Sequence, residues 1–114
     1  MKKKIITIIG TRPEIIRLSR IIPKIDKKYN NILVHTGQNY DYELDKIFIK
    51  ELNLRRPDYY LKARGTFSEQ ISKIIFELEK IILKEKPSKF LVLGDTNSSI
   101  GSIVAKRLGV KVYH

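Results

Sequence analysis

Several residue types are absent or scarce in this chain of 114 residues. It contains no cysteine and no tryptophan, and only four prolines. Without cysteine, the chain can form neither a disulfide nor a metal site built on thiolates. No apolar run approaches the roughly 20 residues that a membrane-spanning helix needs. The sequence therefore excludes a disulfide scaffold and a transmembrane helix.

Acidic residues are also scarce. Asp and Glu total 12 against 23 Lys and Arg, which gives a formal net charge of +11. Such a charge can indicate binding to nucleic acid or to an acidic membrane surface. The basic residues, however, alternate with Glu in 77–80 and 84–86, as is typical of solvated helix faces. We therefore expect one anionic ligand, no specific nucleic acid and no membrane as partners.

Length and composition indicate one modest globular domain. Apolar residues make up 42% of the chain and charged residues 31%, which is ordinary for such a domain. The lysines at 2–4 resemble the start of a secretory signal, but the apolar run Ile5–Ile9 after them is too short for one. We expect a cytoplasmic protein.

Strand-like and helix-like segments alternate along the chain. Strands are predicted at 4–9, 31–36, 58–62, 89–93 and 110–113, the third of them weak and at an edge. Helices are predicted at 14–27, 41–52, 66–86 and 97–108. The apolar residues expected to face inward in the first three helices are Ile15, Leu18, Ile22 and Ile25; Leu44, Ile47, Phe48 and Leu52; and Ile71, Ile74, Ile75, Leu78, Ile81 and Ile82.

Local signals mark two of the helix ends. Thr66–Glu69 has the pattern of a capping box and predicts the start of the long third helix. Pro87 is expected to stop that helix, and Gly109 to close the fourth one at its C′ position.

This alternation predicts an α/β fold, a Rossmann-like doubly wound parallel sheet with helices on both faces. Three polar turns follow its strands, at Gly10–Glu14, Thr36–Tyr40 and Gly94–Ser98. Ligands of such sheets bind at the carboxyl ends of the strands. We therefore expect all three turns at one functional edge.

The first of these turns is the most informative. A strand, a tight Gly10 turn and a helix start present backbone N–H groups to an anion. Pro13 suits the first helical turn and favours an extended Arg12. Its guanidinium is a good bidentate ligand for phosphate. The turn predicts an anion site.

Together the segments Gly10–Glu14, Thr36–Gln38 and Gly94–Thr96 resemble the non-hydrolysing UDP-N-acetylglucosamine 2-epimerases, and the resemblance covers the whole chain. It implies a glycosyltransferase-B-like enzyme of two domains that works as a homodimer without a cofactor or metal. Residues 1–114 would form part of the N-terminal Rossmann-like domain. The rest of that domain and the C-terminal uridine-binding domain would be absent, so that the fragment alone would be inactive.

Longer matches resemble the branch that makes UDP-N-acetyl-L-fucosamine from a 6-deoxy-talose precursor. They span Gly10–Arg20, His35–Leu44 and Gly94–Ser98. The more common branch usually has Lys at the position of Arg17 and His at that of Asn39. In bacterial members the segment at Gln38 and Asn39 contributes to a regulatory site, to which Arg64 also corresponds; Asn39 puts that regulation in doubt here.

The resemblance implies inversion at C2 by elimination and re-addition of UDP. Arg12 would hold the diphosphate and, with Asp95, serve catalysis. Asp95 would lie at a helix N-terminus, which weakens a base, so it could instead bind sugar hydroxyls or stabilise charge at C1. The residues expected to bind the substrate are Gly10, Arg12, Arg17, Gln38, Asn39, Thr96 and His114.

Each of these residues also has an explanation without chemistry. Asp95 could simply cap a helix together with Thr96. Arg12, Arg17 and His114 could be solvated, and Gln38 and Asn39 could only form a turn. We expect His35, inside a strand, to pack in the core. Three other functions stay open: a non-catalytic nucleotide-sugar-binding module, a glycosyltransferase half-domain and a basic nucleic-acid-binding domain.

Overall fold

The computed structural model of the protein describes residues 3–10, 16–17, 19–37, 50, 56–92 and 101–113. Its strands and helices, in chain order, are β1 (Lys4–Ile9), α2 (Ile21–Lys28), β2 (Asn30–His35), β3 (Tyr59–Tyr60), α4 (Phe67–Glu85), β4 (Lys89–Leu91), α5 (Gly101–Arg107) and β5 (Lys111–Tyr113). The helix predicted at 41–52 lies outside the described residues, apart from Lys50, which is helical.

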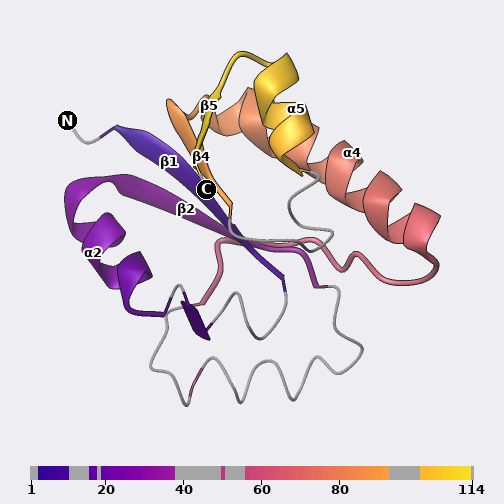
Figure 1. The fold of residues 1–114 in the computed structure, drawn as a ribbon, viewed down its shortest axis with the longest axis horizontal. Coiled ribbons are helices and arrows are strands. Elements are labelled where there is room, and N and C mark those ends of the chain that lie inside the picture. The colour runs from indigo at the N-terminus through magenta and orange to yellow at the C-terminus, as the bar shows by residue number, and fades with distance from the viewer. Residues whose placement is uncertain are drawn as a thin grey trace.

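One parallel sheet runs through the molecule in the order β3-β2-β1-β4-β5. Figure 1 shows α2 on one side of the sheet and α4 with α5 on the other. A parallel sheet needs such cover because its strands are apolar on both faces. The chain winds outward from β1 in both directions, so the predicted doubly wound α/β fold is confirmed.

The two faces of the sheet bury different side chains. Ile6 and Ile8 of β1 join the main core beneath α4 and α5, together with Leu78 and Phe90. Burying one such side chain fully contributes about 1.5–3 kcal/mol. On the other face Thr7 donates a hydrogen bond to Asn31 Oδ1 at 2.7 Å. A buried polar contact therefore joins β1 to β2 on the side of α2.

The first predicted helix, 14–27, is wrong as a single element. Ile16 and Arg17 are helical, but Ser19 and Arg20 form a turn before α2 begins at Ile21. Pro23 explains the break, since it has no N–H to donate to the carbonyl of Ser19 and its ring would clash there. At the third position of α2 the same proline costs no hydrogen bond.

The long helix α4 follows its sequence signals closely. Thr66 and Glu69 make both hydrogen bonds of the predicted capping box. The helix ends at Glu85, just before Pro87, with Lys86 in the left-handed region. Ile75 is a correction, because it is 38% exposed rather than inward. It lies about 100° round the helix from the buried Ile74 and so leaves the core face.

The remaining predictions hold with small shifts. β2 begins one residue earlier than expected, β3 is a two-residue edge strand, and β4 ends at Leu91 with Val92 buried behind it. Gly109 follows α5 with φ +80°, as a C′ glycine does. Within the described part of the chain, every helix is too short or too polar to span a bilayer.

Candidate functional site

The sheet order brings the carboxyl ends of three central strands side by side. β1 lies between β2 and β4, with Ile9 opposite His35 and Thr7 opposite Leu91. The chain reverses its winding between β1 and β4, and this switch point is where such sheets bind ligands. We call the carboxyl ends of β2, β1 and β4 the functional edge. The strands that lead into all three polar turns therefore end together.

The described residues cover part of this edge. Gly10 is buried directly after β1, as a glycine in a tight strand-to-helix turn would be. Arg17 is exposed, in the short helical segment before the turn at Ser19. The other residues that we expect to touch substrate lie outside the described residues: Arg12, Gln38, Asn39, Asp95, Thr96 and His114. Their roles stay predictions.

The turn after β2 is the best-defined part of the functional edge. Gly37 has φ +73°, and a Cβ placed there would lie 2.9 Å from both the N and Cα atoms of Lys62. Only glycine fits this combination of backbone angle and space. His35, confirmed as buried, accepts a hydrogen bond through Nδ1 from the Gly37 N–H at 2.9 Å.

The segment after β3 runs alongside this turn. Its backbone continues the ladder, because Ala63 N–H donates to the Thr36 carbonyl at 2.7 Å. Arg64 Nε donates to the Gly37 carbonyl and its Nη2 to the Tyr60 hydroxyl, each at 3.4 Å. The exposed Arg64 side chain is thus anchored at the functional edge, beside Thr36 and Gly37.

Sequence reasoning missed the roles of Tyr60 and Lys62 here. The ring of Tyr60 packs against that of His35. The backbone of Lys62, at φ +56°, lies in contact with Gly37. The sequence did offer a signal for the neighbouring contact of His35: a side chain that can accept a hydrogen bond stands two residues before Gly37, whose N–H can donate it.

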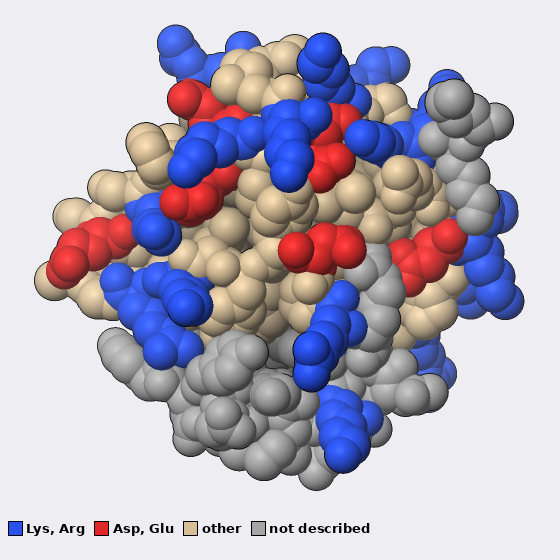
Figure 2. Space-filling model, turned by 180° about the vertical axis from the view of Figure 1, so that it is seen from behind, with Lys and Arg blue, Asp and Glu red and all other residues tan. Residues whose placement is uncertain are grey.

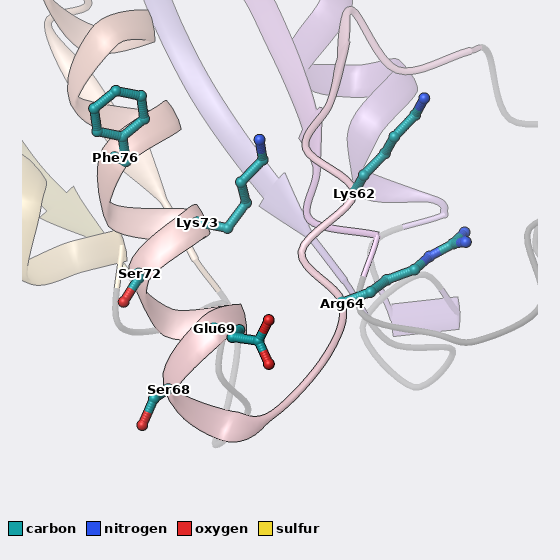
Figure 3. A pocket seen from close by; sticks show the side chains of 7 residues that line it. All are labelled: Lys62, Arg64, Ser68, Glu69, Ser72, Lys73 and Phe76. Atoms are coloured by element: carbon teal, nitrogen blue, oxygen red, sulfur yellow. The ribbon is translucent and has the colours of Figure 1, made fainter.

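An open groove of about 700 Å³ lies between this segment and the first half of α4. Figure 3 shows Lys62 and Arg64 on one side and Lys73 on the other, with Glu69 between them at the base of the helix. The Thr66 backbone N–H donates to Glu69 and holds the pKa of that carboxyl below its usual range. Three cations thus outnumber one carboxylate in the groove.

The described residues offer no cluster of three His, Asp or Glu side chains placed to hold a metal ion. What they offer is a buried glycine directly after β1, a glycine turn after β2 held by His35, and an anchored arginine, all at the carboxyl end of a parallel sheet. These features define a Rossmann-like α/β domain with an edge suited to an anionic ligand.

Comparison with known proteins narrows this class. Residues 23–114 match the family described as UDP-N-acetylglucosamine 2-epimerase. The chain belongs to this family.

Three relatives show how far the likeness extends. The UDP-N-acetylglucosamine 2-epimerase of Methanococcus maripaludis is 46% identical over 97% of this chain and 31% of its own length. The crystal structure of the Methanocaldococcus jannaschii UDP-GlcNAc 2-epimerase in complex with UDP-GlcNAc and UDP has a TM-score of 0.90 at 46% identity, over 97% of this chain and 32% of that one. The UDP-2,3-diacetamido-2,3-dideoxy-D-glucuronate 2-epimerase of Pseudomonas aeruginosa is 41% identical, over 97% of this chain and 32% of its own. The chain thus spans about a third of the length of these relatives, as a half-domain of the larger fold.

Proposed function

We propose that residues 1–114 form one side of the active site of a UDP-sugar 2-epimerase. The observation that carries this proposal is the strand order, which gathers the ends of β2, β1 and β4 at one edge in a chain of this family. The remaining part of the N-terminal domain and a uridine-binding domain would close the cleft from the other side. Relatives crystallised with UDP-GlcNAc and UDP support a UDP-sugar as the ligand.

The proposed reaction inverts C2 of a UDP-N-acetyl-hexosamine. A base removes the C2 proton, the C2–H electron pair forms the C1=C2 bond, and the C1–O pair leaves with UDP. Return of a proton to the opposite face of C2 and re-addition of UDP complete the inversion. We assign Arg12 and Arg17 to the diphosphate, where positive charge stabilises the leaving group. Asp95 is assigned to the reacting carbons, either as the base or as a stabiliser of charge at C1.

Gly10, Gln38, Asn39, Thr96 and His114 complete the proposed substrate-binding set. Gly10 is the one of these that the structure describes, and its burial directly after β1 suits a backbone approach to phosphate. The proposal also includes a homodimer and a cytoplasmic location for the full-length protein, both from the family resemblance.

Arg64 belongs to a separate part of the proposal, a regulatory site for a second UDP-sugar. Its Nε donates to the carbonyl of Gly37, the residue that precedes Gln38 in the sequence. Since Asn39 replaces the usual histidine, we expect any such regulation to be weaker here than in relatives with histidine.

A chimera tests the enzyme proposal. In the Methanocaldococcus jannaschii relative, residues 1–114 would replace the matching third, which has the same fold at a TM-score of 0.90. The remaining two-thirds of that relative would be kept. We expect the chimera to epimerise UDP-N-acetylglucosamine and to exchange its C2 hydrogen in D₂O. The isolated chain should do neither, because the reaction needs groups from both sides of a cleft.

The matched control is Asp95→Asn in the same chimera. Asn caps a helix about as well as Asp, so circular dichroism should stay unchanged while turnover is lost. A folded but inactive chimera would favour the second candidate, a non-catalytic nucleotide-sugar-binding module. The observation behind this candidate is that the chain spans only about a third of the length of its relatives. Robust turnover by the isolated chain would contradict the half-site proposal.

A further inference from the structure

The last residue of β2, His35, is a buried histidine whose ring makes both a packing contact and a hydrogen bond. His35 is fully buried, and its ring packs on Tyr60 with centroids 4.8 Å apart and planes inclined by 34°. The two residues are also paired in register across β2 and β3. This packing would need an aromatic ring but no ring nitrogen.

The ring nitrogen has its own partner. Nδ1 of His35 accepts a hydrogen bond from the N–H of Gly37 at 2.9 Å. A side chain that accepts from the N–H two residues later normally belongs to Asn or Asp, in an Asx turn. An accepting Nδ1 carries no proton, so the ring is neutral with its proton on Nε2. The histidine thus imitates an Asx turn at the end of a strand.

The turn that His35 holds has little freedom to move. Gly37 is at φ +73° and lies against the backbone of Lys62, with no room for a Cβ. Lys62 is itself at φ +56°, a conformation that costs a non-glycine residue about 1–2 kcal/mol. Two left-handed residues in contact therefore depend on the surrounding hydrogen bonds.

Arg64 closes the set of contacts. Its Nε donates to the Gly37 carbonyl and its Nη2 to the Tyr60 hydroxyl, each at 3.4 Å. Gly37 is thus bonded on its N–H side to His35 and on its carbonyl side to Arg64. Tyr60 contacts both of those side chains.

We propose that His35 is a positioning residue at the functional edge: its Nδ1 fixes the Gly37 turn, which precedes Gln38 of the proposed substrate site, and, through the Gly37 carbonyl, the guanidinium of Arg64 of the proposed regulatory site. Gln38, assigned to the substrate, follows that turn directly in the chain. This inference rests on the proposed function for its ligand, but the hydrogen bond and its effect on Arg64 can be tested without any ligand.

Two substitutions separate positioning from packing. His35→Asn removes the ring but keeps an acceptor in Asx-turn geometry. His35→Phe keeps the ring and its stacking on Tyr60 but removes the acceptor. If His35 acts by positioning, the Gly37 amide and Arg64 Nε–Hε signals in NMR spectra stay near their wild-type positions in the Asn variant and move in the Phe variant. The opposite pattern would show that His35 only packs, and would overturn the proposal.

A measurement on the unmodified chain guards against a variant that fails to fold. An N–H···N hydrogen bond transmits a scalar coupling between its two nitrogens, so ¹⁵N-labelled protein should show a coupling between Gly37 N and His35 Nδ1. The His35 Nδ1 shift should be that of an unprotonated nitrogen. A protonated Nδ1, or no coupling at neutral pH, would overturn the proposal.

Titration with UDP then connects the turn to the ligand. We expect UDP to shift the Gly37 and Arg64 signals of the wild-type chain, and to bind His35→Phe roughly three- to tenfold more weakly, the effect of about one lost hydrogen bond. His35→Asn should bind as the wild type does. If UDP shifts no signal in any of the three, the proposed ligand site fails, whereas the coupling and the two variants still decide the role of His35. Equal weakening in both variants would contradict a positioning role.

Discussion

At the scale of single residues, Glu85 links three parts of the fold. The Tyr59 hydroxyl donates to Glu85 Oε2 at 2.6 Å, and Lys4 Nζ donates to Glu85 Oε1 at 3.2 Å. The hydrogen bond from Tyr59 is the main cause that lowers the pKa of Glu85. The same bond, with burial, raises the pKa of Tyr59 from 10.0 to about 12. The edge strand β3 is thereby fastened to the end of α4 and the start of β1.

Tyr59→Phe should cost about 1 kcal/mol of unfolding free energy at pH 7, because it removes a hydrogen bond to a charged group and keeps the ring. The lowered pKa of Glu85 stabilises the fold above its ordinary value of 4.5 and is lost as the pH falls further. The raised pKa of Tyr59 stabilises it below pH 10.0 and is lost as the pH rises through about 12. Urea unfolding should therefore show a constant wild-type advantage between these limits and a smaller one outside them. Tyr113→Phe, at a half-exposed tyrosine, is the control, and an equal loss there would contradict the assignment.

The sequence predicts the position of the functional edge but not the contacts inside it. Gly10 and Gly37 each follow an apolar strand. Because the carboxyl ends of parallel strands lie at one edge of the sheet, the apolar pattern predicts that the two glycines lie near each other. The hydrogen bond from Gly37 to His35 depends on a ring orientation that no periodicity encodes. The anchoring of Arg64 depends on pairing between β2 and β3, a two-residue strand with almost no pattern of its own.

At the scale of elements, α4 and α5 approach closely through a glycine. Gly101 is buried at the start of α5, and a Cβ there would overlap Leu78 Cδ1 of α4 and lie 3.4 Å from the ring of Phe90. Both neighbours are fully buried in the main core. The glycine therefore sets the distance at which α5 packs on α4 and the sheet.

Gly101→Ala should destabilise the fold by about 1–3 kcal/mol, since an added methyl in a packed core forces neighbours to move. The intrinsic gain of helix propensity, at most about 1 kcal/mol, acts in the opposite direction. Ser102→Ala, on the same helix and only partly buried, is the matched control and should change stability by less than about 0.5 kcal/mol. Thermal unfolding of both variants measures the difference. A stabilised Gly101→Ala chain would show that the contact relaxes without cost.

Elements whose ends carry a recognisable local signal follow the sequence, and the predicted helix that contains an internal proline does not. The capping box at Thr66 and the glycine at 109 fix the ends of α4 and α5 as predicted, because each supplies a specific hydrogen bond or backbone angle. The division of 14–27 was missed because its apolar spacing continues across Pro23. Periodicity reports which face is apolar, whereas a proline acts on one backbone hydrogen bond.

At the scale of the whole molecule, the net charge of +11 has to be explained. Figure 2 shows acidic side chains among the lysines and arginines on one face of the described region, rather than a continuous basic stripe. We predict that the chain binds duplex DNA or RNA weakly and without sequence preference. Affinity should fall at least tenfold between 50 and 200 mM salt, because phosphate contacts alone would hold the complex. Fluorescence anisotropy with two unrelated duplexes tests this; tight binding of only one of them at 150 mM salt would promote the nucleic-acid alternative.

The choice of sugar is also a property of the whole enzyme. From the resemblance of Gly10–Arg20 and His35–Leu44 to the 6-deoxy-talose branch, we predict that the full-length protein prefers that nucleotide over UDP-N-acetylglucosamine. The relatives reported above carry the names of other 2-epimerases, so the resemblance alone supports this prediction. The two sugars differ at C6, where only N-acetylglucosamine carries a hydroxyl, and also in the configuration of ring carbons, since talose and glucose are not the same stereoisomer. A pocket that merely accommodates a methyl group would discriminate by about 10²-fold, whereas one built to hydrogen-bond the hydroxyl rejects its absence far more strongly.

Values of kcat/KM measured side by side on both nucleotides test the prediction, with the UDP-2,3-diacetamido-2,3-dideoxy-D-glucuronate named for the Pseudomonas aeruginosa relative as a third substrate. A clear preference for UDP-N-acetylglucosamine would assign the chain to the common branch, and a preference for the third sugar would assign it to the branch of that relative.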